Sequence, residues 1–309
     1  MLLENELGIP YSQWMALQYN YDYDTIAIDK RNAENSEAAR KEAVISEQVN
    51  IKEIYKRLRI ASKSVVERIR QLYERLHCDP LDSARIEAQT TGLFKRSDKL
   101  SSDEKNMRTW ILLAHSFAKE AKVSCNYKKG NAVNAAKTIA DKANKQTLNV
   151  AFIRECLSAN GIAYVEIPKL DHTPIDAYSM MSEGTPAIAV TYRYNDIDKL
   201  AFDILHELCH IDRHIENGCS FIAMDGSIYS DSPIEQEANK FAQDMLIPQD
   251  VWDSILSTES RCLNPHLLAE IVAREAEKRG ISKTIAIARY KHDTNAYNIR
   301  SCRSPKIVY

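Results

Sequence analysis

The chain contains few residues that interrupt regular structure, with only 8 glycines and 9 prolines among 309 residues. Because these two residue types disfavour helices most strongly, their scarcity favours a helix-rich structure. Opposite charges nearly balance, at 41 Lys and Arg against 43 Asp and Glu. No overall field therefore favours nucleic acid, although a local basic patch is compatible with this balance.

Long apolar runs, a signal peptide and paired cysteines are also missing. No apolar run approaches the roughly 20 residues that span a bilayer. Residues 1–14 lack a basic region followed by an apolar core, the pattern of a signal peptide. The seven cysteines have no CxxC spacing, and an odd, scattered set favours reduced thiols over a disulfide scaffold; they are Cys78, Cys125, Cys156, Cys209, Cys219, Cys262 and Cys302. We therefore expect a cytoplasmic protein without a membrane partner.

The first half of the chain carries helical patterns. Residues 1–25 predict one short helix followed by an irregular stretch, and residues 33–50 predict an exposed helix or linker. Residues 51–76 have apolar side chains at helical intervals and predict two packed helices with a break near Ser62. Three further helices are expected at about 102–122, 131–143 and 149–160.

The second half begins with short segments rich in β-branched and aromatic residues. These segments, 162–168, 175–181 and 186–194, predict a three-stranded meander. A helix capped by Asn195 or Asp196 follows and continues to about residue 215. Beyond an expected loop at 216–231, further helices are predicted at 232–245, 249–258, 265–279 and 281–290. The fold class is therefore α+β, helix-rich, with a small mostly antiparallel sheet.

The helix that follows the last predicted strand contains His-Glu-Leu-Cys-His at 206–210, an HExxH motif. On a helix, His206 and His210 lie one turn apart on the same face and can bind one Zn²⁺. Glu207 then lies beside the open coordination position, where a general base is needed. A chain of this length contains the motif by chance roughly once or twice in a hundred cases. A third ligand is therefore needed to support the interpretation.

The helix predicted at 232–245 supplies two candidates for that ligand, Glu235 and Glu237. Asn239 follows Glu235 by four residues on the same helical face, where its carboxamide can hold a ligating histidine in the right tautomer. Glu237 is offset and should face elsewhere, as a surface charge. The spacing therefore favours His206, His210 and Glu235 as zinc ligands, with Asn239 supporting one of the histidines.

Two histidines, a glutamate and a metal-bound water suit hydrolysis of a peptide bond. Glu207 would take a proton from the water and later protonate the leaving amine. A further donor should steady the developing oxyanion, and the sequence does not choose among its candidates; they are His214, Tyr194, Tyr192, Tyr290 and His292. If segment 186–194 is an edge strand, an extended peptide could bind by adding a strand to it.

Several of these candidate residues also have a simpler structural interpretation. His206 and His210 could be ordinary buried histidines, and His214 could be a charge at the end of a helix. Cys209 lies between the two histidines and could be a redox switch, although a small buried packing residue is the simpler interpretation. The tyrosines between residues 11 and 23 could stack on bases, but a packing surface is the simpler interpretation for them too.

These motifs resemble those of the ImmA/IrrE family of zinc metallopeptidases. HELCHIDRH at 206–214 and EQEANKFAQDMLIP at 235–248 match the family's metal helix and its second, glutamate-led helix. The resemblance implies a gluzincin-like domain, zinc ligands His206, His210 and Glu235, and catalytic Glu207. The residue between the motif histidines is usually Gly or Ala in this family, so Cys209 is a mild departure.

A looser resemblance covers most of the remaining chain. Residues 13–22, 51–60, 94–97 and 287–297 are similar to long HigA-type regulators, which place an Xre-type helix-turn-helix before the peptidase domain. Residues 1–20 leave room for at most the last helix of that motif, so autonomous DNA binding is not expected.

Together the patterns predict three regions. These are an N-terminal helix and linker at 1–45, a helical domain at 46–148, and an ImmA/IrrE-like metallopeptidase domain at 149–309. The expected function is a zinc-dependent endopeptidase that cleaves a repressor or antitoxin-like regulator during stress or phage and mobile-element conflict, a role implied by the resemblance alone. The alternative is a non-catalytic antitoxin or transcription regulator with a structural or sensory zinc site. Whether the chain forms a homodimer is left open.

Overall fold

The structure is a computed structural model that describes residues 6, 8–77, 103–215, 221–224, 233–257, 265–299 and 304–307. Its internal contacts divide the chain into two compact units, residues 1–81 and 82–309. None of the described helices combines the length and the apolar composition that crossing a bilayer requires.

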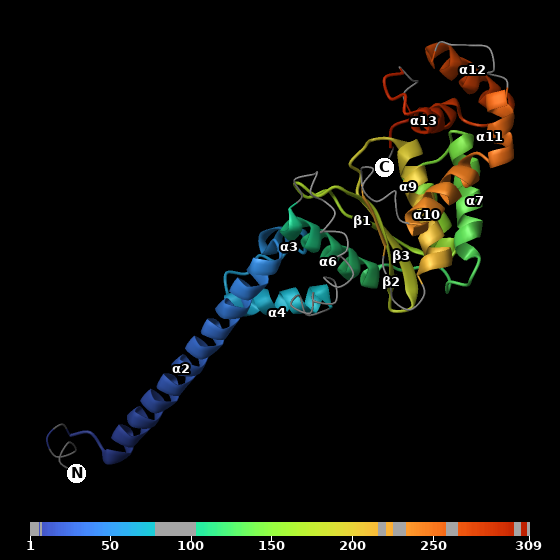
Figure 1. Ribbon diagram of the computed structural model, residues 1–309. Helices are drawn as coiled ribbons and strands as arrows, with labels where there is room; N and C mark the ends of the chain where they lie inside the picture. The colour runs from blue at the N-terminus through green and yellow to red at the C-terminus, as the bar shows by residue number, and fades with distance from the viewer. Residues whose placement is uncertain are drawn as a thin grey trace. The chain divides into compact units, whose positions relative to one another are not determined.

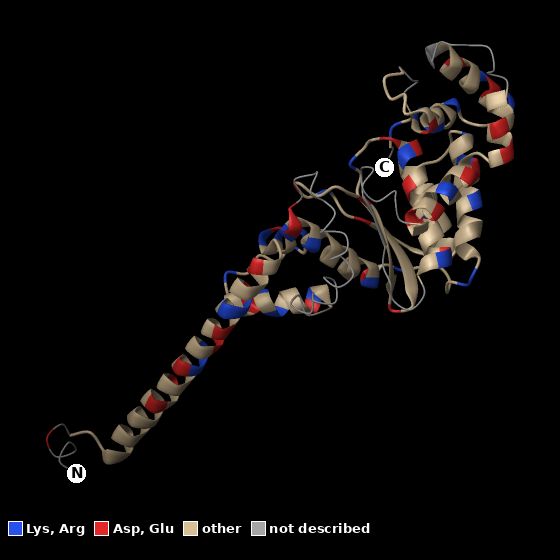
Figure 2. Cartoon of the chain, viewed as in Figure 1, with Lys and Arg blue, Asp and Glu red and all other residues tan. Residues whose placement is uncertain are grey.

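The first unit begins with one long helix, α2 (Tyr11–Gln48) (Figure 1). The short helix followed by an irregular stretch predicted at 1–25 was wrong, since one helix continues from Tyr11 through that region, whereas the largely exposed helix at 33–48 agrees with the helix or linker expected at 33–50. The physical reason is that residues 11–48 contain no glycine or proline, and alternating polar and aromatic side chains do not by themselves stop a helix. Its first two turns lack charged residues, which appear farther along the helix (Figure 2).

Two shorter helices complete this unit, α3 (Ile51–Arg57) and α4 (Val65–Leu76). The predicted break near Ser62 is confirmed, and the Ser64 side chain caps α4 by accepting from the Glu67 backbone N–H. Arg68 of α4 donates to both carboxylate oxygens of Glu42 on α2, at 2.8 and 2.9 Å, and the Tyr55 hydroxyl donates to Glu42 at 2.7 Å. This polar cluster joins α2 to the helices that follow it.

The second unit is built around a four-stranded sheet of order β1-β3-β2-β4. Its strands are β1 (Ala163–Glu166), β2 (Ile175–Ser182), β3 (Thr185–Val190) and β4 (Phe221–Met224). β2 pairs antiparallel with β3 and β4, whereas β1 pairs parallel with β3. The sheet is thus mostly antiparallel, and the predicted helix-rich α+β class is confirmed.

The predicted meander was wrong in its strand order. β2 and β3 form a hairpin closed by Glu183 and Gly184, both with positive φ, the conformation that two-residue hairpin turns need. The β1–β2 connection passes β3, so β3 lies between β1 and β2 instead of at an edge. The strand before α9 (Ile197–Cys209) is β3, and it is therefore a central strand. Residues 221–224 were expected to belong to a loop at 216–231, but they form β4, which pairs with β2.

Helices cover both faces of the sheet. On one face, Trp110 and His115 of α6 (Glu104–Glu120) pack edge-on against Tyr178 of β2. Ser179, the next residue of β2, faces the opposite side, because successive strand residues alternate. There it comes close to Glu207 of α9 (Ile197–Cys209), so α9 lies on the face opposite α6.

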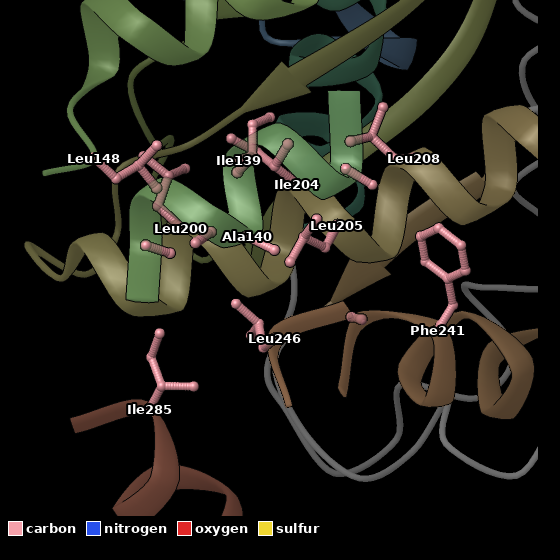
Figure 3. Packing of buried hydrophobic residues seen from close by; sticks show 14 of the residues in the cluster. Ile139, Ala140, Leu148, Leu200, Ile204, Leu205, Leu208, Phe241, Leu246 and Ile285 are labelled. Atoms are coloured by element: carbon pink, nitrogen blue, oxygen red, sulfur yellow. The ribbon is translucent and has the colours of Figure 1, made fainter. Parts of the chain in front are cut away.

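The main core lies between α9, α7 (Asn131–Asn144) and α10 (Pro233–Leu246). Ile139 of α7, Leu205 of α9 and Leu246 of α10 point into this layer (Figure 3). Both α6 and α7 thus pack within the second unit, although the sequence analysis assigned them to a helical region at 46–148. The other helices of this unit are α8 (Val150–Ala159), α11 (Gln249–Leu256), α12 (Pro265–Lys278) and α13 (Lys283–Thr294).

Candidate metal centre

Helix α9, which carries His206 and Glu207, begins at a capping aspartate and leads into a π-helical turn. The Asp196 carboxylate accepts from the backbone N–H groups of Asp198 and Lys199, at 3.0 and 2.9 Å, and fixes the start of α9. After Cys209 the helix widens into a π-helical turn, η1 (His210–His214), closed by a 2.8 Å bond from Ile215 N–H to His210 C=O. π-turns of this kind often occur at functional sites.

His206, His210 and Glu235 converge at the crossing of α9 and α10. One nitrogen or oxygen atom from each lies within 4.8 Å of the others, and both histidines are buried. The two Nε2 atoms are 3.0 Å apart, and the Glu235 carboxylate oxygens lie 3.1 Å from His206 Nε2 and 3.4 Å from His210 Nε2. The three side chains selected from the sequence therefore meet at one point.

These distances fit a zinc ion. Zn²⁺ binds histidine nitrogen and carboxylate oxygen at about 2.0–2.1 Å with tetrahedral geometry, so neighbouring ligand atoms should lie about 3.3 Å apart. The two Nε2 atoms are 3.0 Å apart, and each lies near that distance from one Glu235 oxygen, His206 Nε2 from Oε2 at 3.1 Å and His210 Nε2 from Oε1 at 3.4 Å. Two histidines and one glutamate fill three corners and leave the fourth open for water or substrate.

The protonation states also suit metal binding. Burial lowers the pKa of His210 to about 4, so its ring is neutral at pH 7 and has a lone pair available. Burial alone would raise the pKa of Glu235, but its hydrogen bonds with His206 and His210 bring it to about 2. His210 and Glu235 thus have the forms that a divalent cation needs. At His206 burial lowers the pKa, but the hydrogen bond with Glu235 and the Glu207 charge outweigh burial and raise it, so a bound ion would displace a proton there.

Asn239 supports His206 from the side away from the metal centre. Its Oδ1 lies 3.0 Å from His206 Nδ1, so an Nδ1–H can donate to it and leave Nε2 unprotonated toward Glu235. Glu235 and Asn239 share one face of α10 because they are four residues apart. This contact is the one expected of a residue that holds a ligating histidine in place.

Glu207 is completely buried, and neither of its carboxyl oxygens has a hydrogen-bond partner in the part of the chain that the structure describes. Burial raises the pKa of this carboxyl to about 8, while the nearby His206 charge and then the Ser179 hydroxyl lower it. The Ser179 oxygen likewise makes no hydrogen bond of ordinary geometry. An unpaired carboxyl is costly inside a protein, and bound water or a cation beside it would offset that cost.

His214 and Glu237 form a polar pair behind His210. His214 Nδ1 lies 2.9 Å from His210 Nδ1, and His214 Nε2 lies 3.1 Å from a Glu237 oxygen. The structure therefore places His214 beside the metal centre, with one ring nitrogen engaged by His210 and the other by Glu237. Glu237 faces away from the three candidate ligands, as predicted, yet it bonds His214 and Arg213 instead of being a plain surface charge.

The contacts shown for the other candidate oxyanion donors are with residues outside the three ligands. The Lys199 ammonium and the Arg193 guanidinium lie over the Tyr194 ring, 5.5 and 5.3 Å from its centroid. The Tyr192 hydroxyl is 2.8 Å from the Tyr164 hydroxyl. His292 is exposed and bonds Asp293, while Tyr290 is buried in the α13 side of the core.

Cys209 packs in the core with no exposed surface. Burial raises the pKa of its thiol to about 12, so the thiol is protonated and weakly reactive, as a packing residue should be. Cys125, Cys156 and Cys209 are free thiols among the described residues. The other four cysteines and segment 94–97 lie outside the described residues.

Sequence reasoning missed two features of the centre. The contact between Ser179 and Glu207 joins a strand to a helix 28 residues away, and no local pattern signals it. The His210–His214 pair did have a signal, the i, i+4 spacing of two histidines, but the contact between their rings is visible only in the structure.

Residues 162–289 match the Peptidase_M78 family model, described as the IrrE N-terminal-like domain. This segment contains the sheet, α9, the π-helical turn and α10, and therefore every candidate ligand. No curated protein is found to match the chain. The resemblance to the ImmA/IrrE family is thus confirmed, and residues 162–289 belong to this metallopeptidase-type family.

Proposed function

We propose that the chain is a zinc-dependent endopeptidase. The observation that supports this most strongly is the buried Glu207 carboxyl, which has no hydrogen-bond partner among the described residues and stands next to three convergent candidate ligands. A purely structural zinc site has four protein ligands and no need of a buried base beside it. Here His206, His210 and Glu235 would hold the ion.

When bound, zinc would supply a Lewis acid that polarises the scissile carbonyl and acidifies a water molecule. Glu207 would accept a proton from the attacking water as the new O–C bond forms. It would then deliver that proton to the leaving nitrogen as the C–N bond breaks, which completes hydrolysis without loss or gain of protons. Asn239 would keep His206 in the tautomer that presents Nε2 to the ion.

We propose a protein substrate, a repressor or antitoxin-like regulator whose cleavage answers stress or phage and mobile-element attack. The family resemblance supports this role. β3 cannot accept an added strand, because β1 and β2 occupy both of its sides. Among the described strands the outer positions belong to β1 and β4, so an extended peptide would bind along one of those two.

Metal analysis and substrate trapping test the proposal. Purified protein should contain about one zinc per chain, and His206→Ala should lose it. A Glu207→Gln variant should retain zinc and hold an uncleaved partner in a pull-down, and the wild-type protein should cleave that partner. Absence of zinc, or an unmodified partner after long incubation with the wild type, would count against the proposal.

One observation favours a second candidate, a partner-binding regulator with a structural or sensory zinc. Along α2, the side chains of Tyr11 to Glu37 are exposed apart from Trp14, and several are large and apolar. Exposed aromatic side chains are typical of interaction surfaces. This candidate predicts tight partner binding without turnover, and binding that survives removal of zinc would favour it.

A further inference from the structure

The pair behind His210 forms a continuous polar chain that ends at the candidate metal centre. Arg213 Nη1 donates to one Glu237 oxygen at 2.6 Å, and the other oxygen lies 3.1 Å from His214 Nε2. His214 Nδ1 lies 2.9 Å from His210 Nδ1, and His210 Nε2 faces Glu235. Four side chains from two elements thus lead from the protein surface to a ligand atom.

Only one arrangement of protons lets this chain work with His210 as a ligand. To bind an ion through Nε2, a neutral His210 must carry its proton on Nδ1. That Nδ1–H can only donate, so His214 Nδ1 must be the acceptor and bear no proton. The His214 proton then lies on Nε2, and this N–H donates to Glu237. The direction is fixed, because an ionised carboxylate can only accept hydrogen bonds.

The negative charge of Glu237 strengthens both hydrogen bonds of the chain, from His210 to His214 and from His214 to Glu237, because each donor points toward that charge. Hydrogen bonds to ionised groups are roughly twice as strong as neutral ones. The Arg213 guanidinium pairs with Glu237 and keeps it ionised, and the ring of His214 is only 9% exposed, so water competes little. A negative charge at one end of a hydrogen-bonded chain increases electron density at the far nitrogen, the ligand atom.

His210 and His214 are four residues apart on the π-helical turn η1, so their side chains leave the helix in similar directions. The centroids of His210 and His214 are 5.0 Å apart, with the rings tilted by 55°, so their Nδ1 atoms face each other. His210 itself begins this turn and accepts its closing bond.

From this geometry we infer that His214 and Glu237 are positioning residues that fix the tautomer and orientation of His210 and strengthen its hold on the ion. The inference rests on the proposed metal site and adds the residues that tune it. The sequence analysis offered His214 as a candidate oxyanion donor. Because its two ring nitrogens contact His210 and Glu237, we assign it instead the support of His210.

Zinc affinity of the full chain, measured by chelator competition, tests the inference. His214→Ala should weaken zinc binding by about 10–100-fold, the usual cost of removing a residue that supports a ligand. His214→Asn should restore much of it, because the Asn carbonyl oxygen stands where Nδ1 stood and can accept from His210. Glu237→Gln should give an intermediate loss, since it keeps the shape and removes the charge.

Controls separate this effect from damage to the fold. His292→Ala is a matched control, because His292 also contacts an acidic residue, Asp293, but its side chain is exposed at the protein surface. This variant should bind zinc with wild-type affinity. All variants should melt at the wild-type temperature without metal. In the zinc-loaded wild type, imidazole NMR should show the His214 proton on Nε2, and cobalt-substituted His214→Ala should have an altered visible spectrum.

The outcomes distinguish the two proposals. Unchanged zinc affinity and an unchanged cobalt spectrum in His214→Ala would overturn the inference while leaving the metal site standing, as would a His214 proton on Nδ1. Normal zinc binding without peptide cleavage would refute the endopeptidase and leave the inference intact. A wild-type protein that binds no zinc would overturn both.

Discussion

Replacing Glu207 by glutamine tests the proposed reaction with little disturbance of the fold. The two side chains have nearly the same shape, and neither carboxyl oxygen has a hydrogen bond to lose among the described residues. Burial raises the pKa of Glu207 to about 8, so without metal both side chains are mostly neutral at pH 7 and the variant should melt close to the wild-type temperature. The three candidate ligands are untouched, and zinc content should stay at about one per chain.

The expected loss lies in the rate of cleavage. An amide cannot take the proton from water, and a positioned general base contributes about 10²–10⁴-fold to a rate. That range corresponds to about 3–5 kcal/mol of transition-state stabilisation. Glu235→Gln is the matched control, because the same chemical change there removes a carboxylate that contacts both His206 and His210. That control should lose zinc as well as activity.

An assay that needs no known substrate is the mass-spectrometric count of new amino termini in a mixture of denatured proteins. The wild type should create a defined set of termini, and the Glu207→Gln variant should create almost none within the same time. The same termini appearing at comparable rates with the zinc-loaded variant would refute the assigned role of Glu207. Termini that also persist with His206→Ala would reveal a contaminating protease.

Three further predictions concern other parts of the chain. Asn239→Ala should weaken zinc binding by about 10–100-fold, measured by competition with a chelator, because His206 loses the oxygen that fixes its tautomer. Hydrogen bonds from Arg68 lower the pKa of Glu42, so its stabilising effect is present at neutral pH and is lost as the pH falls through the lowered value. The melting temperatures of wild type and Glu42→Gln should therefore differ at pH 7 and converge in acid; an unchanged difference would contradict the ion pair's role. Ile139→Ala should cost about 2–5 kcal/mol in urea unfolding because the side chain is fully buried between helices, whereas exposed Lys137→Ala should cost almost nothing.

The local elements that carry the site were predictable because their signals are local. Asp196 caps α9, Pro233 starts α10, and both helices fall close to the predicted bounds. The i, i+4 spacing of His206 and His210 fixes their shared face, and the same spacing separates Glu235 from Asn239. By contrast, α2 was misjudged because weak helix formers looked like a break, although nothing in residues 11–48 actually stops a helix.

Strand order and the surroundings of the ligands depended on long-range packing. The parallel pairing of β1 with β3 depends on where the β1–β2 connection crosses, and short β-rich segments do not encode that choice. β4 gains its strand conformation by pairing with β2, so its own four residues gave no signal. For the same reason, the position of Tyr194 just before the metal helix could not show that its ring packs against the side chains of Arg193 and Lys199.

The sequence by itself determined which chemistry is available: two histidines on one helical face, a glutamate between them, and a second helix with a carboxylate and an amide at matching spacing. Helical periodicity is a property of the local chain, so these placements needed no partner. Only the tertiary structure decided that the helices cross where the ligand atoms are 3.0–3.4 Å apart, and that Glu207 is buried with no hydrogen-bond partner among the described residues. It also decided that His214 and Glu237, from two separate elements, meet behind His210, because distances between separate elements follow from packing of the whole core.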